Sequence, residues 1–599
     1  MVIIGINPAI DSTAILIKDG KIMAAVAEER LSRRKLHYGF PKRAILECLR
    51  IAKVNPRQVD RVVFSYNSNV FAHPALTKAF LEKDWSPFDK ENVIPIQLAL
   101  KTFWEYWRDG GRRFWPPKTS NPAYYFDNEI MFKKKLAEIG INRADLGHFD
   151  HHTCHAASAY YCSGFSDSLI ITADGAGDLL WTTISIGKNG ELFRLSEVER
   201  QTSIGLLYAA VTKFLGFKPH RHEGKVTGLA AFGNPQKYIK VMKHALDINN
   251  HGEFVRRMDT SKWKVVRLML LKLARNQFMR HPEVNLFIDH FENNLSGASR
   301  EDVAAAAQGL LEELMVKWVE KWVKKTGKSR ISLAGGIFAN VRLNQKISEI
   351  HGIKNVYVQP NMGDGGTALG AVLLTWQRFL EERGSIFKSE LLKNVYFGPE
   401  FSDSEIEKAI QQSGLKGKLV NDIEKRTAKA ISEGKIVGWF QGRMEWGPRA
   451  LGNRSLLASA TDRTINDTLN VRLKRTEFMP FAPSVLDTDV SKYMKYSNNC
   501  DQPSKFMTIT FDCTALAKKK VPAVVHVDGT ARPQIVEKKT NPKYYRVLQE
   551  YKKLTGLGIF VNTSFNIHEE PIVCTPQDAI RSYKLNSCDA LAMGNWWIE

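Results

Sequence analysis

Two histidines set one helical turn apart are the clearest candidates for chemistry in this 599-residue chain. His151 and His155 occur in DHHTCHAAS, and an i, i+4 spacing on a helix lets both imidazoles ligate one metal ion. A third ligand must come from elsewhere, and Asp364, in the glycine-rich turn NMGDGGTALG, is well placed to supply it. Cys154 could act as a soft ligand, although it competes with His155. The alternative is a histidine cluster at a helix start that binds no metal.

The last third of the chain sets basic residues among glycine, proline and aromatic residues. Arginine grips phosphate oxygens with two parallel donors and lysine acts as a point charge, so these runs predict a shaped pocket for a polyanion. A solvated basic surface is the alternative. The residues are Arg443, Arg449 and Arg454 in GRMEWGPRALGNR, Lys474 and Arg475 in KRTEF, Arg532 in DGTARPQ, and the small polar Ser564 and Asn566 in NTSFN.

Two segments of the first half share one pattern, which predicts the elements that position these residues. Residues 2–29 and 168–199 each read as an apolar strand, a corner rich in Asp, Gly or Asn, and a β-ribbon that turns at Asp19-Gly20 or Asn189-Gly190. Such a repeat is typical of a duplicated actin-like nucleotide-binding fold, whose corners offer backbone N–H groups to phosphate. We therefore assign Asp174 and Gly177 of the second corner to nucleotide binding. Two unrelated hairpins in an α/β protein are the alternative.

A third nucleotide element is expected at residues 329–345, SRISLAGGIFANVRLNQ. A strand ends before Gly335 and Gly336, which let the chain approach a flat ligand closely. Asn340 and Asn344 then lie one helical turn apart on one face. This arrangement could hold an adenine and a ribose.

Composition limits the class of protein. The length predicts two or three domains, and the absence of an 18-residue apolar run excludes a membrane span; the best candidate, residues 265–274, is interrupted by Arg267 and Lys272. The start, MVIIGIN, reads as a buried strand rather than a signal peptide. Seven scattered cysteines, none in a CxxC, predict reduced thiols and a cytoplasmic protein. The net charge of +22 fits a nucleic-acid surface, anion pockets or solubility, and charge alone does not choose.

Together the motifs resemble the O-carbamoyltransferases of the nodulation, cephamycin and tobramycin type. They occur in the same order along nearly the whole chain: GINPAIDSTAILIKDGKIMAAVAEERLSRRK, HHTCHAASAYY, TADGAGD, HEGKVTGLAAFG, LAGGIFANVRLN, GDGGTALGA, GWFQGRMEWGPRALGNRS, KRTEFMPFAPSVL, HVDGTARPQ and FVNTSFN. The resemblance implies an α/β Kae1-like domain of the actin-like (ASKHA) class over residues 1–395, followed by an α+β YrdC-like domain over residues 396–599. It also implies a homodimer.

The resemblance implies a two-step reaction. The YrdC-like domain condenses carbamoyl phosphate with ATP to carbamoyl-adenylate, and the Kae1-like domain moves the carbamoyl group to a hydroxyl of a small-molecule natural product. It implies that His151, His155 and Asp364 ligate a metal, usually Fe²⁺ in this family, with Zn²⁺ or Mg²⁺ as alternatives. In the second domain the resemblance assigns catalytic roles most strongly to Arg449, Lys474, Arg532 and Ser564, and it implies that Arg443 and Asn566 also bind the anions.

The chain departs from the family pattern in two places. The family has a His-Asp pair in an FHDP or YHDS corner, whereas PAIDST here is one residue shorter and keeps only Asp11. The base acting on the acceptor hydroxyl is therefore Asp11 with a pKa raised by burial, His37, or a group on the acceptor. Residues 70–130, with Trp85, Trp104, Trp107 and Trp115, and residues 250–300 match no motif and read either as an acceptor pocket or lid or as helix packing.

Two other functions compete with this interpretation. Kae1-like and YrdC-like domains also serve tRNA threonylcarbamoylation, and a nucleic-acid-binding module that has lost catalysis would keep the positive charge. The motif details and the filled catalytic positions favour a small-molecule transferase that binds no nucleic acid. RNA binding with a steep salt dependence would favour either alternative.

Overall fold

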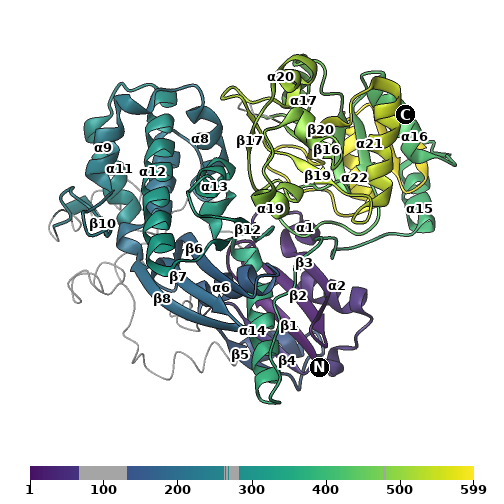
Figure 1. Ribbon diagram of the computed structural model, residues 1–599. Coiled ribbons are helices and arrows are strands. Elements are labelled where there is room, and N and C mark those ends of the chain that lie inside the picture. Colours follow the sequence, from purple (N-terminus) through teal and green to yellow (C-terminus); the bar gives the residue numbers. More distant parts are fainter. Residues whose placement is uncertain (67–130, 262–263, 265–266, 269–281, 476–480) are drawn as a thin grey trace.

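The computed structural model describes residues 1–66, 131–261, 264, 267–268, 282–475 and 481–599. Three sheets organise the chain (Figure 1). The purple and blue strands of the N-terminal part (residues 1–395) form two five-stranded sheets, and the green and yellow strands of the C-terminal part (residues 396–599) form one of eight strands. Among the described residues, no helix is both long enough and apolar enough to cross a membrane.

The two N-terminal sheets have the same topology. The first has the order β3-β2-β1-β4-β5 and the second β8-β7-β6-β11-β12; in each the first three strands are antiparallel and the last three parallel. The strands are β1 (Val2–Asn7), β2 (Thr13–Lys18), β3 (Lys21–Ala27), β4 (Arg61–Phe64) and β5 (Asp145–His148), then β6 (Asp167–Gly177), β7 (Leu180–Lys188), β8 (Glu191–Glu199), β11 (Arg330–Ala334) and β12 (Asn355–Val358). Both predicted strand–corner–hairpin units are therefore present.

Two helices between these sheets position the predicted metal ligands: one carries His151 and His155, and the other follows the turn that carries Asp364. Helix α6 (His151–Tyr161) packs on α14 (Thr367–Glu381), and both contribute alanines and other apolar residues to a core that also contains Ile3 of β1 and Ile170 of β6. Small side chains on both helices permit this close packing. The 3-10 turn η6 (Asp364–Gly366) begins directly before α14.

A block of helices covers the second sheet. These helices are α7 (Ile204–Phe214), α8 (Glu223–Ala230), α9 (Ile239–Ala245), α11 (Pro282–Asn294) and α12 (Arg300–Thr326). Phe287 and Phe291 of α11 are fully buried, so this part of the unmatched region 250–300 packs in the core. The four tryptophans expected to line an acceptor pocket between residues 70 and 130 lie outside the described residues.

The C-terminal sheet is mixed and is covered by helices on both faces. Its order is β13 (Lys418–Leu419), β22 (Trp596–Ile598), β21 (Ala590–Met593), β14 (Val437–Phe440), β15 (Arg454–Ala458), β20 (Ile559–Ser564), β16 (Ala482–Leu486) and β19 (Gln534–Val536). One core packs α16 (Ile423–Ser432) and α21 (Pro542–Thr555) on it, and another packs α15 (Asp403–Ser413), α17 (Thr464–Arg472) and α22 (Pro576–Lys584).

Shorter elements connect these layers. The helices are α1 (Glu28–Ser32), α2 (Lys42–Ala52), α13 (Val341–Ser348), α18 (Val490–Tyr493), α19 (Asp501–Lys505) and α20 (Ala515–Lys520); the remaining strands pair as β9 (Asp247–Ile248) with β10 (Phe254–Val255) and β17 (Phe511–Asp512) with β18 (Thr530–Ala531). All seven cysteines lie within the described residues and are free and buried.

Candidate functional site

Four side chains from three elements converge between the two N-terminal sheets. His151 and His155 lie on α6, which begins at His151 because the Asp150 carboxylate caps its first turn by accepting from the Thr153 N–H at 2.8 Å. Asp174 comes from β6 and Asp364 from η6. Both imidazoles are fully buried.

The donor atoms of these side chains face one another. The Nε2 atoms of His155 and His151 lie 3.2 and 3.5 Å from Asp174 Oδ2, and 3.9 and 3.8 Å from Asp364 Oδ1. His151 Nε2 is buried without a hydrogen-bond partner. Two imidazole nitrogens, one of them without a hydrogen-bond partner, and two carboxylate oxygens fit a divalent metal ion. This donor set suits either iron or zinc.

Electrostatics also fit a cation. Burial would raise the pKa of Asp174, yet the close imidazoles of His151 and His155 lower it well below the usual value. Burial and the charge of Asp174 raise the pKa of Asp364 to about 8. Asp364 therefore stays protonated near neutral pH unless a cation binds between the two carboxyls. The Tyr66 hydroxyl donates to Asp364 Oδ2 at 2.7 Å and orients it.

Sequence reasoning placed Asp174 and Gly177 at a phosphate, whereas the structure places them at the histidines. Asp174 supplies the fourth donor, and a Cβ on Gly177 would lie 2.0 Å from His151 Cδ2, so the glycine makes room for the imidazole. The signal available in the sequence is that Asp174 lies in the corner of its strand–corner–hairpin unit, as Asp11 does in the first unit. Cys154 is not a member of this group.

The candidate base Asp11 lies beside the same turn. It adopts a left-handed backbone with φ of 56°, and the Gly365 N–H, next to Asp364, donates to its carboxylate. Burial and the nearby Glu29 raise its pKa to about 7, a value that suits a general base. The ring of the other candidate, His37, is buried, with Nδ1 3.0 Å from Ser32 Oγ.

The predicted adenosine loop packs against β6, the strand that carries Asp174. Gly335 has φ of 109°, and a Cβ there would lie 2.1 Å from the Ala173 carbonyl; one on Gly336 would lie 3.0 Å from Asp174 Oδ1. Asn340 caps α13 by accepting from the Leu343 N–H. Asn344 donates to the carbonyls of Phe338 and Thr508, both at 2.7 Å. The structure therefore uses both amides in packing contacts.

A second cluster, of three guanidiniums, lies at the boundary between the two parts of the chain. Burial lowers the pKa of Arg449 and of Arg475 to about 10, and burial together with these two neighbours lowers that of Arg532 well below its usual value. The Nε atoms of Arg449 and Arg532 are buried, and no described residue forms a hydrogen bond with them. Within the described ranges no carboxylate pairs with the three arginines, so the cluster is suited to an anion.

Contacts of Arg475 and Arg449 show which segments lie beside this cluster. Arg475 donates to Thr563 Oγ1 at 3.1 Å, next to the predicted Ser564 at the end of β20. Arg449 Nη2 lies 3.4 Å from the carbonyl of Ala339, in the predicted adenosine loop. The anion cluster and that loop therefore adjoin.

Four predicted residues do not join the cluster. Arg454 is fully buried and donates to the carbonyls of Gln441, Gly442, Asn453 and Pro399. Arg443 donates to the carbonyls of Met23, Phe397 and Gly398, which ties the two parts of the chain together. Lys474 is exposed at φ of 54°, and no described contact joins its ammonium to the arginines; its neighbour Arg475 points inward instead. Asn566 donates to the carbonyls of Ile567 and Glu570 and so shapes the following loop.

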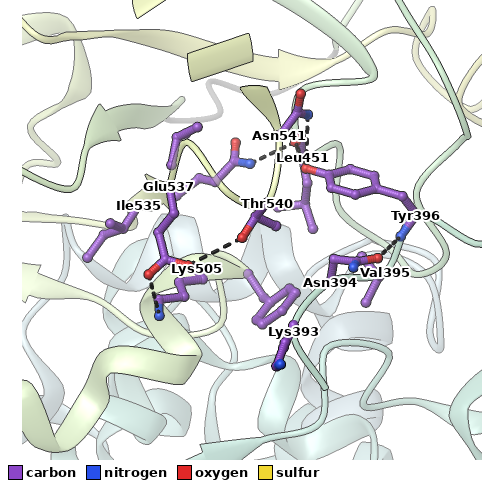
Figure 2. Close-up of a pocket in the computed structure, with 13 residues that line it drawn as sticks. Lys393, Asn394, Val395, Tyr396, Leu451, Lys505, Ile535, Glu537, Thr540 and Asn541 are labelled. Carbon is purple, nitrogen blue, oxygen red and sulfur yellow. Dashed lines mark hydrogen bonds and ion pairs between the residues drawn. The ribbon is translucent and has the colours of Figure 1, made fainter. Parts of the chain in front are cut away.

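A pocket is lined by residues 393–396 and by further residues of the C-terminal part (Figure 2). It is lined by residues such as Tyr396, Lys505, Glu537 and Asn541, and by none of the predicted site residues. Its walls are tied to each other: Lys505 pairs with Glu537 at 3.0 Å, and Tyr396 donates to the Leu451 carbonyl at 2.7 Å. We assign no chemistry to it.

Comparison with known proteins identifies the family of this chain. The family models for the carbamoyltransferase N-terminus and C-terminus match residues 2–373 and 428–599. An uncharacterised Synechocystis protein is 33% identical over 98% of this chain and 94% of its own. Nodulation protein NolNO of Sinorhizobium fredii is 31% identical over 98% of this chain and 79% of its own length. The 3'-hydroxymethylcephem-O-carbamoyltransferase of Streptomyces clavuligerus is 29% identical over 50% of this chain and 55% of its own length. Both family models match in order along a single chain that carries both clusters, so this protein is a transferase and belongs to the carbamoyltransferase family.

Proposed function

We propose that this protein is an ATP-dependent O-carbamoyltransferase that uses carbamoyl phosphate as donor and a hydroxyl of a small molecule as acceptor. Residues 396–599 act as a YrdC-like domain that makes carbamoyl-adenylate, and residues 1–395 as a Kae1-like domain that transfers the carbamoyl group. The observation that carries the proposal is the buried cluster of Arg449, Arg475 and Arg532 in the same chain as the His-Asp group.

The first step joins two polyanions. Water cleaves carbamoyl phosphate to carbamate and phosphate; a carbamate oxygen then attacks the α-phosphorus of ATP, and pyrophosphate leaves. Both substrates repel each other, so fixed cations that need no reorganisation lower the barrier. Arg449, Arg475 and Arg532 supply them, with Ser564 as a hydroxyl donor and Lys474 as the cation at the entrance. The backbone around Gly335 and Gly336 receives the adenosine.

The second step transfers the carbamoyl group. Asp11 accepts the proton of the acceptor hydroxyl, the oxygen attacks the carbamoyl carbon, and AMP leaves. A pKa of about 7 keeps Asp11 able to take up that proton near neutral pH. His151, His155, Asp174 and Asp364 would hold a divalent metal, which we propose to be Fe²⁺ with Zn²⁺ or Mg²⁺ as alternatives. When bound, such an ion polarises the carbamoyl oxygen.

The acceptor class rests on a relative. The Streptomyces clavuligerus relative is named for a hydroxymethyl cephem, which is a small-molecule hydroxyl. We propose an acceptor of that class, a cytoplasmic homodimer, and no nucleic-acid partner. The experiment supplies carbamoyl phosphate, ATP and a panel of hydroxylated natural products. AMP and pyrophosphate should form in equal amounts. Stoichiometric ADP would contradict the adenylate, and RNA binding with a steep salt dependence would favour a tRNA substrate.

A further inference from the structure

The loop that follows the NTSFN motif makes many of its contacts with the N-terminal part. Four successive backbone carbonyls of this 567–572 loop accept from cations of that part: Glu569 from Arg221 at 3.3 Å, Glu570 from Lys35 at 3.4 Å, and Pro571 and Ile572 from Arg33, both at 2.8 Å. The loop is therefore part of the C-terminal sequence but lies at the boundary, in contact with the N-terminal part.

The Glu569 side chain makes the strongest of these contacts. Its Oε1 lies 2.8 Å from His222 Nε2, and its Oε2 lies 2.8 Å from Arg221 Nη2 and 3.8 Å from Lys218 Nζ. The hydrogen bond with His222, with the charge of Arg221, lowers the pKa of Glu569 to about 2, so the carboxylate is ionised. Charge-assisted hydrogen bonds of this kind are directional and strong.

The backbone at Glu569 is strained, which shows that the contacts determine its conformation. Its φ is 67°, in the left-handed region that a residue other than glycine adopts at a cost. Such conformations persist only where the surroundings hold them. Here the surroundings are Arg221 and His222 of the N-terminal part.

The loop in turn positions the anion site. Asn566 donates to its carbonyls at Ile567 and Glu570, and the His568 N–H donates to the Leu473 carbonyl, two residues before Arg475. Both the turn that carries Ser564 and the segment that carries Arg475 are therefore attached to the same loop. A shift of the loop would move donors on both sides of the anion.

His222, His568 and Glu569 also offer three ligand atoms close together, but the hydrogen bonding does not suit a metal ion. The Lys218 N–H donates to His222 Nδ1 at 3.3 Å, so the proton of the neutral ring sits on Nε2 and points at Glu569. Two cations already occupy the other carboxylate oxygen.

We propose that Glu569 is a positioning residue of adenylate formation: held by Arg221 and His222, it keeps the 567–572 loop in the conformation that arranges Ser564 and Arg475 around the anionic donor. This proposal rests on the proposed function. It adds that the C-terminal site is complete only when the N-terminal part holds this loop.

The test compares two neighbouring glutamates in the full chain. Glu569→Gln removes the charge that faces the N-terminal part, and Glu570→Gln is the matched control because its carboxylate pairs with Arg581 inside the C-terminal part. In pyrophosphate–ATP exchange, Glu569→Gln should raise the KM for carbamoyl phosphate about tenfold and leave kcat within about twofold, since only a fraction of the free protein stays competent to bind. Glu570→Gln should leave both unchanged.

A double-mutant cycle shows whether Arg221 and Glu569 act together. Arg221→Ala should also raise the KM, and the double variant should show less than the sum of the two single effects, because both substitutions remove the ion pair between Arg221 and Glu569. Additive effects, or equal KM values for Glu569→Gln and Glu570→Gln, would overturn the proposal, as would loss of a second metal equivalent in His222→Ala.

A readout independent of turnover separates this inference from the proposed function. Hydrogen–deuterium exchange over residues 565–573 should speed up in Glu569→Gln and Arg221→Ala but not in Glu570→Gln. Absence of exchange between pyrophosphate and ATP in the wild type would reject the proposed function, and the deuterium comparison would still decide whether Glu569 holds the loop. Unchanged protection in Glu569→Gln would reject that role.

Discussion

At the scale of residues, the His-Asp group depends on close contacts that allow no extra atoms. Gly177 lies against the ring of His151, and Asp174 reaches both imidazoles from the same strand. The ring has little room to move because it is fully buried. The geometry of the donors therefore depends on a residue that offers no donor itself.

Gly177→Ala should displace His151 and weaken metal binding. Its Cβ would lie 2.0 Å from the ring, and overpacking of this kind costs about 1–3 kcal/mol in a buried site. Elemental analysis and thermal melting measure both effects. Gly175→Ala is the control, because a Cβ there meets only Leu206 at 3.8 Å. Equal metal content in the two variants would show that Gly177 does not position His151.

The sequence predicted the local features of this group and missed the tertiary ones. The i, i+4 spacing predicts the paired imidazoles because helical periodicity is a local property. The role of Asp174 depends on how β6 packs against α6, which no spacing encodes. In the same way, Lys474 and Arg475 are adjacent, and which of them faces the anion cluster is set by the left-handed backbone at Lys474.

At the scale of elements, one short helix caps another. Pro41 precedes α2 and gives it no side-chain cap, so the Glu28 carboxylate of α1 accepts from the N–H groups of Arg43 and Ala44 instead. Burial raises the pKa of Glu28 to about 7. The two strand–corner–hairpin units were predictable from alternating patterns and turn residues, whereas this cap between α1 and α2 was not.

Burial of the Glu28 carboxyl predicts a pH dependence of stability, because burial raises its pKa more than the capping hydrogen bonds with Ala44 and Arg43 lower it. Between about pH 4.5 and pH 7 the folded protein keeps a proton on Glu28 that the unfolded chain has lost, so stability falls as the pH rises through this window. The full effect is on the order of 3 kcal/mol. The melting temperature of Glu28→Gln, taken relative to that of the wild type, should therefore be higher at pH 8 than at pH 5. Glu47→Gln on α2, whose carboxylate pairs with Arg50, is the control; a Glu28→Gln difference that does not change with pH would contradict the assignment.

At the scale of the whole molecule, the two clusters belong to different parts of the chain, and these two parts meet at a boundary with many cations. Arg30 donates to the Gly447 carbonyl, two residues before Arg449, and Arg443 donates to the Met23 carbonyl in the opposite direction. The motif order in the sequence predicted both parts, and the comparisons confirm the family. The contacts between the parts join residues hundreds of positions apart, and sequence patterns do not encode them.

The most direct test of the account is pyrophosphate–ATP isotope exchange in the presence of carbamoyl phosphate, which reports adenylate formation alone. Arg532→Ala removes one fixed cation of the anion cluster and should slow exchange by a factor on the order of 10²–10³. His155→Ala removes a donor of the His-Asp group and should abolish carbamoyl transfer while exchange stays near the wild-type rate. Normal exchange in Arg532→Ala, or its loss in His155→Ala, would contradict the division of the two steps between the two clusters.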